Sequence, residues 1–221
     1  MIKISTAEKI IFVFLLFVAA MLLMRIAYAN NFRYIFLMWN LFLAWVPFQI
    51  SLVISSAKKP NRWMKYFLLA AWLLFFPNAL YIITDLLHLG NGDNKVPLWF
   101  DVILLFTSSI ASLVMAFVSL YNVELFLRNN LKAKHINKLI VGCLFLGSFG
   151  VYLGRFLRWN SWDIVANPVS LLFEVAIRFS NPLVHYRTWA VTLLLTCLFS
   201  LLYYAAKQLP VLLEEKKLRI D

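Results

Sequence analysis

Acidic, imidazole and amide side chains follow a proline at the end of an otherwise apolar stretch. Pro77 removes a backbone N–H and leaves the carbonyl of Leu73 without its helical donor, and Asn78 follows at once. Asp85 and His88 are three residues apart, so they share a helical face. A carboxylate and an imidazole at this spacing can act as general acid and base. The alternative is that polar side chains at a helix end near the headgroups only cap the helix and pair with one another.

Two further side chains extend this pair into a candidate metal site. Asp101 and His185 fall near the same predicted membrane face as Asp85 and His88. Catalytic zinc takes three protein ligands and keeps one position for water. The two aspartates and two histidines can supply these three ligands. A divalent metal is therefore the one cofactor that the sequence suggests.

Three arginines form a candidate anion site. Arg155 and Arg158 lie one turn apart at the end of the fifth apolar stretch, and Arg187 precedes the last one. The planar guanidinium donates two parallel hydrogen bonds to a carboxylate or phosphate, which lysine cannot do. The alternative is that such arginines pair with aspartates of the same chain, such as Asp101 and Asp163, and lock the helices together.

The elements that must position these residues are membrane-spanning helices. The chain has 221 residues, of which 63% are hydrophobic and 14% charged. A span needs roughly 20 apolar residues. We predict an all-α, polytopic helix bundle forming one integral membrane domain over 1–221. Its six predicted spans are residues 10–28, 34–56, 65–85, 98–121, 138–157 and 187–207.

A seventh helix is predicted between the last two spans. Residues 167–179 are apolar apart from Ser170, Glu174 and Arg178, which recur every four residues as one narrow stripe. This pattern is typical of a short helix that lies in the membrane interface, re-enters the membrane, or packs on the bundle.

The basic residues indicate which side is cytoplasmic. Six spans place both termini on one side, which holds 14 Lys and Arg residues against 7 on the other. The positive-inside rule makes that side cytoplasmic. The first set has 11 Lys and 3 Arg, whereas the second has 1 Lys and 6 Arg, which indicates selection for fixed pairing on the outer side. Topology thus explains the net charge of +11, and no nucleic-acid partner is predicted.

Three motifs resemble a known family. They are Trp39-Asn40 with Trp45-Val46-Pro47, Pro77-Asn78 with Thr84-Asp85, and Arg155-Phe156-Leu157-Arg158-Trp159-Asn160-Ser161-Trp162-Asp163. Together they resemble the bacterial integral membrane proteins catalogued as domain of unknown function 1361. The resemblance covers nearly the whole chain and implies a bacterial multi-pass membrane protein, without an activity. Six residues of these motifs are predicted to have a structural role: Asn40, Pro77, Asn78, Trp159, Asn160 and Asp163.

The sequence leaves three functions open. The first is a multi-pass protein of the bacterial plasma membrane that binds or acts on an anionic lipid headgroup or envelope precursor. Arg155, Arg158 and Arg187 would hold the anion, and Asp85 and His88 would supply the chemistry. The second is a small-solute transporter with kinked helices at Pro47 and Pro77. The third is a non-catalytic assembly partner in the membrane. Polar groups gathered at one face favour the first.

Overall fold

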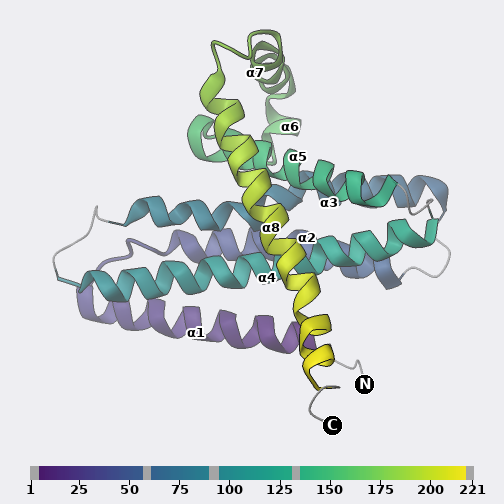
Figure 1. The fold of residues 1–221 in the computed structure, drawn as a ribbon. Coiled ribbons are helices and arrows are strands. Elements are labelled where there is room, and N and C mark those ends of the chain that lie inside the picture. The colour runs from purple at the N-terminus through teal and green to yellow at the C-terminus, as the bar shows by residue number, and fades with distance from the viewer. Residues whose placement is uncertain (1–4, 57–60, 90–94, 131–134, 218–221) are drawn as a thin grey trace. The chain divides into compact units, whose positions relative to one another are not determined.

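The computed structural model describes residues 5–56, 61–89, 95–130 and 135–217. The basic stretches at 57–60 and 131–134, which enter the prediction of sidedness, lie outside these residues. The described part is helical (Figure 1), and six of its helices are long and apolar enough to cross a membrane. The prediction of an all-α protein with six spans is confirmed. The chain divides into two compact units, Met1–Ala133 and Lys134–Asp221, each described here by itself. The single domain over 1–221 stays a prediction.

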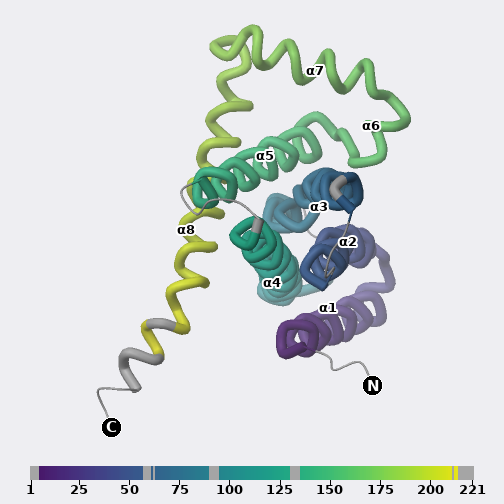
Figure 2. The backbone as a smooth tube through the Cα atoms, turned by 90° about the vertical axis from the view of Figure 1, so that its right-hand side faces the viewer, coloured from purple at the N-terminus to yellow at the C-terminus, as the bar shows by residue number. Residues whose placement is uncertain are grey.

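The first unit contains four long helices and one 3-10 segment. These are α1 (Thr6–Ala29), α2 (Phe36–Ser56), α3 (Arg62–Tyr81), η1 (Ile82–His88) and α4 (Leu98–Asn130). α2 packs on both α3 and α4, whereas α1 packs on α4. Figure 2 shows the four long helices almost end-on. α4 extends to Asn130, past the predicted end at residue 121. Glu124 and Arg128 form an i, i+4 ion pair, which stabilises the additional turns of this helix.

Serines of α4 bind the backbone where α3 changes to a tighter helix. The hydroxyl of Ser112 donates to the carbonyl of Ala79 at 2.7 Å, and that of Ser109 to the carbonyl of Ile82 at 3.3 Å. Carbonyls at such a transition lose their regular helical donor, and a membrane offers no water in its place. The two serine hydroxyls therefore supply hydrogen bonds to backbone carbonyls after Pro77, so the change from α-helix to 3-10 helix can lie inside the bundle.

One serine joins three helices. Trp72 of α3 donates from its indole Nε1 to the hydroxyl of Ser119 at 2.6 Å. Ser119, on α4, donates in turn to the carbonyl of Pro47 in α2 at 3.1 Å. Trp72 and Ser119 are both fully buried. Hydrogen bonds between helices hold these spans together where apolar burial gives no preference for protein over lipid.

The second unit pairs two long helices and joins them by two short ones. They are α5 (Ile136–Leu157), α6 (Asp163–Ala166), α7 (Pro168–Ser180) and α8 (Tyr186–Lys217). α5 packs along α8. Figure 2 shows α7 running from α6 back to the start of α8. α7 starts at Pro168, as the sequence predicts, although the Asn167 side chain makes no capping hydrogen bond.

Candidate functional site

Asp85 is held inside the first unit by an amide of a neighbouring helix. It lies in η1, is 1% exposed, and accepts a hydrogen bond from Asn40 Nδ2 of α2 at 2.9 Å. His88 follows one turn later, with its ring 5.3 Å from that of Phe36. In a 3-10 helix residues three apart eclipse one another, so the two side chains share a face, as predicted. Asn40 therefore positions the buried carboxylate.

Asp101 forms the second buried polar centre of this unit. Arg25 of α1 donates from Nε to Asp101 Oδ1 at 2.7 Å and from its Nη2 to Asp101 Oδ2 at 3.3 Å. The Arg25 side chain is 0% exposed and that of Asp101 is 4% exposed. The third guanidinium nitrogen, Nη1, donates to Asn31 Oδ1 at 2.8 Å. Arg25 and Asp101 therefore form an ion pair within the chain. Pairing of this kind is the alternative to anion binding that was given for the outer arginines.

An aromatic ring completes the centre around Arg25. The guanidinium carbon of Arg25 lies 4.5 Å from the ring centroid of Tyr34, and that of Arg33 lies 5.4 Å from it. Cations over an aromatic face are attracted by its quadrupole. Burial, and next the nearby charge of Asp101, raise the pKa of the Tyr34 hydroxyl. Tyr34 lies in the connection between α1 and α2, so it closes the end of the bundle over the ion pair.

The residues of the candidate metal site are distributed over both units. Asp85, His88 and Asp101 belong to the first unit, whereas His185 belongs to the second. Among the described residues, no group of three or more His, Cys, Asp or Glu side chains could hold a metal ion. Asp101 already receives two hydrogen bonds from Arg25. The four-residue metal site stays a prediction.

Arg158 occupies an unusual backbone position in the second unit. It is the C-cap of α5 in the left-handed conformation, with φ 62° and ψ 30°. Its backbone N–H and that of Trp159 both donate to the carbonyl of Leu153. Glycine, or sometimes asparagine, is the usual residue here, because a Cβ atom is crowded in this conformation. The Arg158 side chain is exposed, and in the described part of the chain it makes no hydrogen bond or ion pair.

The aspartate nearest in sequence to Arg158 is used within its own loop. Asp163 Oδ2 accepts a hydrogen bond from the backbone N–H of Asn160 at 2.6 Å, three residues earlier. Asp163 starts α6, where a carboxylate is favoured by the helix dipole. The proposed internal pair of Arg158 with Asp163 is therefore not formed in this structure. In this structure the Asp163 carboxylate thus shapes the turn after Trp159.

The other predicted anion ligands lie at the ends of the two long helices of this unit. Arg155 is in the last turn of α5, half-buried, and Arg187 is in the first turn of α8, exposed. Arg187 Nε donates to the hydroxyl of Tyr186 at 3.4 Å. His185 precedes α8 and is half-buried. The connection α6–α7 joins the two helix ends, so it lies next in sequence to both arginines.

The polar stripe of α7 runs from an exposed residue, Ser170, to a buried one, Arg178. Arg178 is 6% exposed and pairs with Glu174, four residues earlier. The Arg178 carbonyl accepts from the indole Nε1 of Trp189 at 3.3 Å, which ties α7 to α8. The apolar residues Val169 and Leu172 are 78% and 68% exposed. α7 thus exposes apolar side chains and buries its ion pair only at its C-terminal end, and its place in the membrane interface stays a prediction.

Three important residues were not singled out by the sequence. Arg25 enters the prediction of sidedness only as one of the seven basic residues of the outer side. None of the predicted sites includes Tyr34 or Ser119. The usable signal was the position of Arg25 inside an apolar span, because a charge there needs a partner. Nothing in the sequence indicates that this partner is Asp101, 76 residues away.

Comparisons with known proteins agree with the motifs. A family model described as "Protein of unknown function (DUF1361)" matches residues 39–202. The match includes the Trp39-Asn40 motif, the stretch from Pro77 to Asp85, and the loop from Arg155 to Asp163. No curated protein and no solved structure matched the chain.

Proposed function

The chain belongs to the DUF1361 family of proteins of unknown function, and from this premise we propose that it is a plasma-membrane protein that binds an anionic group. The group is a phosphate-bearing lipid headgroup or envelope precursor. Arg155, Arg158 and Arg187 of the second unit hold it. Both termini are cytoplasmic in this proposal, and the arginine-bearing loop is outside, in line with the positive-inside rule.

The observation that carries the proposal is the left-handed conformation of Arg158. A non-glycine residue in this region costs roughly 1–3 kcal/mol and persists where the surroundings or the function require it. Glycine would form the same C-cap without that strain. In the described residues, the exposed side chain of Arg158 makes no hydrogen bond or ion pair that would offset the cost. An exposed guanidinium kept at a strained position therefore supports a role toward an external ligand.

The chemistry around Arg158 favours an anion as this ligand. Asp163, the nearby carboxylate, is engaged by the backbone of Asn160. Glu174 is paired with Arg178. Guanidinium groups bind phosphate with two parallel hydrogen bonds, and Arg155 lies one turn before Arg158 in sequence. Binding is proposed in preference to catalysis, because Asp85 is 1% exposed and accepts from Asn40.

The test is titration of the detergent-purified protein with inorganic pyrophosphate by calorimetry. Arg158→Lys keeps the charge but loses the fork, so we expect the affinity for pyrophosphate to fall at least about tenfold, or ~1.4 kcal/mol. Arg128→Lys is the matched control, since Arg128 pairs with Glu124 on another helix and should leave the affinity unchanged. Equal affinity in the parent and in Arg158→Lys would reject the proposal.

A further inference from the structure

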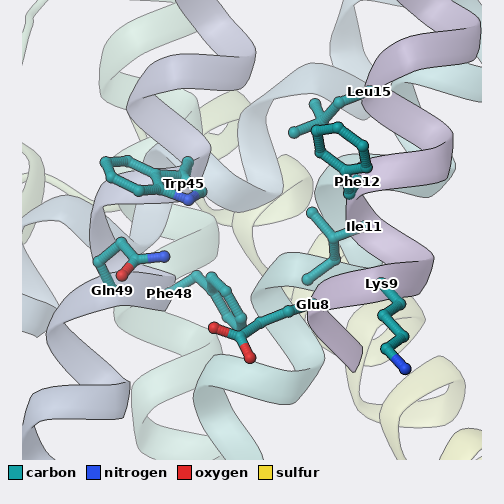
Figure 3. Close-up of a pocket in the computed structure, with 8 residues that line it drawn as sticks. All are labelled: Glu8, Lys9, Ile11, Phe12, Leu15, Trp45, Phe48 and Gln49. Atoms are coloured by element: carbon teal, nitrogen blue, oxygen red, sulfur yellow. The ribbon is translucent and has the colours of Figure 1, made fainter. Parts of the chain in front are cut away.

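A groove runs between α1 and α2 in the first unit. It has a volume of about 340 Å³, and Figure 3 shows the residues that line it. Although α1 and α2 are consecutive, α1 packs chiefly on α4, which leaves this gap between them. The volume lies within the range of small-molecule sites, about 300–1,000 Å³. All residues that line the groove belong to the first unit, whereas the arginines of the proposed anion site belong to the second.

The groove has an apolar floor and an open apolar rim. Ile11 and Phe48, which are 3% and 1% exposed, form the floor. Phe12, Leu15 and Trp45 line it further along, and Phe12 and Trp45 are 60% and 39% exposed. Both helices are spans, so this side of the groove opens toward the hydrocarbon of the bilayer. An apolar chain that enters from the membrane would meet only apolar side chains here.

The polar residues gather at one end of the groove. Glu8 and Lys9 lie in the first turn of α1, and Gln49 lies on α2. Figure 3 shows the Glu8 carboxylate reaching toward Phe48 of α2, whereas the Lys9 ammonium extends away from α2. From Glu8 to Leu15 the helix advances about 10 Å, at ~1.5 Å per residue. The groove thus changes from charged to apolar along the membrane normal. A phospholipid has the same gradient from headgroup to acyl chain.

The side chains of Glu8 and Gln49 leave hydrogen-bonding capacity toward the groove. Glu8 Oε2 accepts from the backbone N–H of Ser5 at 2.7 Å in a capping box, which fixes the carboxylate at the start of the helix. In the described part of the chain, the half-buried side-chain amide of Gln49 makes no hydrogen bond. A carboxylate together with an amide donor matches a headgroup that carries both an ammonium and a phosphate.

We propose that this groove binds one phospholipid with an amine headgroup. One acyl chain lies over the floor of Ile11 and Phe48, and the headgroup ammonium meets Glu8. Gln49 donates to the polar region between headgroup and chains. The gap between α1 and α2 is in this way filled by lipid and not by protein.

The experiment is native mass spectrometry of the purified full chain with dioleoyl phosphatidylethanolamine or dioleoyl phosphatidylglycerol. We expect the parent to retain a bound lipid and to prefer the amine headgroup. Leu15→Trp fills the groove and should remove that lipid. Leu16→Trp makes the same change on a residue that is 54% exposed and does not line the groove, and it should retain the lipid.

A second variant addresses the headgroup without filling the groove. Glu8→Gln keeps the capping box, which accepts Glu or Gln, but removes the negative charge. The loss of one charge-assisted hydrogen bond should lower the retention of phosphatidylethanolamine about tenfold and leave phosphatidylglycerol unchanged. This variant decides the question if Leu15→Trp fails to fold.

Two results would overturn the proposal. One is a folded Leu15→Trp variant that keeps as much lipid as the parent. The other is a lipid-free dimer of the parent that Leu15→Trp converts to monomer, because the groove would then be covered by a second copy of the chain. Neither result touches the pyrophosphate titration, so this inference and the proposed anion site fail or stand separately.

Discussion

The guanidinium of Arg25 in α1 donates two hydrogen bonds to the carboxylate of Asp101 in α4, from Nε to Oδ1 at 2.7 Å and from Nη2 to Oδ2 at 3.3 Å. Both side chains are buried. This ion pair connects α1 to the rest of the first unit, because α1 packs mainly on α4. Asp101 also lies in the first turn of α4, where the helix dipole favours a negative charge. The ion pair of Arg25 with Asp101 therefore helps to fix α1 against α4.

Removing one partner of this pair should be strongly destabilising. A buried charge left without its partner costs about 3–5 kcal/mol, and we expect that loss for Asp101→Asn. Arg25→Lys keeps the charge but loses the fork, so we expect a smaller loss of about 1–3 kcal/mol. The free energy of unfolding in detergent measures it. Arg33→Lys is the control, because Arg33 lies near Tyr34 but has no ion pair in the described residues. A change below ~1 kcal/mol for both variants of the pair would contradict this reading.

The half-buried amide of Asn40 should matter chiefly through Asp85. Asn40→Leu keeps the branched shape of the side chain but removes the donor 2.9 Å from the carboxylate, so Asp85 loses that hydrogen bond. We expect a loss of about 1–3 kcal/mol in unfolding free energy. Asn40→Leu combined with Asp85→Leu should recover part of it. If the double variant is as unstable as the sum of the two single ones, the two side chains do not act together.

The metal hypothesis makes a separate prediction. If Asp85 and His88 are ligands, purified protein should carry about one equivalent of a divalent metal, as catalytic sites do, and His88→Ala should lose it. Elemental analysis of protein purified without chelator measures the content. His135→Ala is the control, since His135 precedes α5 and is exposed. Metal content that stays the same in His88→Ala would exclude His88 as a ligand.

The pKa of Tyr34 predicts a loss of stability at high pH. Burial raises the pKa of its hydroxyl in the folded protein above the ordinary value of 10.0. The folded state then keeps a proton that the unfolded state releases, so the contribution of Tyr34 to stability is complete below pH 10 and declines as the pH rises through the folded-state pKa. Unfolding free energies of the parent and of Tyr34→Phe should converge over this range. Tyr28→Phe, at a residue 72% exposed, is the control.

Periodicity and hydropathy predicted the spans because each span is long and nearly uniform in composition. The predicted second and fifth spans agree closely with α2 and α5. The change to a 3-10 helix at Ile82 was not predicted, because it depends on serines of α4 that accept the altered backbone. Arg25 contacts Asp101 because α1 packs on α4, and no local sequence pattern predicts that packing. The sequence thus indicates which polar residues inside a span need a hydrogen-bonding partner, whereas the packing of the helices determines which residue that partner is.

The proposed sidedness can be tested with single cysteines in a chain whose Cys143 and Cys197 are replaced by serine. Asn160→Cys and Asn61→Cys make the same substitution at two exposed loop positions. The positive-inside rule places Asn160 outside and Asn61 in the cytoplasm. An impermeant thiol reagent should therefore label the first on intact cells and the second only after lysis. The reverse pattern would place the arginines of the proposed anion site in the cytoplasm.

Arg158→Gly separates the backbone of the C-cap from the function of the side chain. Glycine adopts φ 62° without the steric cost of a Cβ atom, which is about 1–2 kcal/mol, and the greater freedom of glycine in the unfolded chain offsets about 0.5–1 kcal/mol of that gain. We therefore expect the variant to be more stable than the parent in thermal unfolding, by about 1 kcal/mol at most. The same variant should lose affinity for pyrophosphate, because the guanidinium is gone. Gain of stability with loss of binding is the pattern of a residue kept for function at a structural cost. Arg155→Gly is the control, since Arg155 lies within the last turn of α5 and glycine there should destabilise the helix by about 1 kcal/mol.

A double-mutant cycle then identifies what Arg158 binds. Asp163 accepts from the backbone of Asn160, so Arg158→Lys and Asp163→Asn should act independently on unfolding free energy, within about 0.5 kcal/mol. Asp163→Asn alone should destabilise the turn before α6. Coupling of more than ~1 kcal/mol would show that Arg158 and Asp163 pair within the protein. In that case the strained cap serves an internal ion pair, and an external anion is no longer needed to explain why arginine occupies a position suited to glycine.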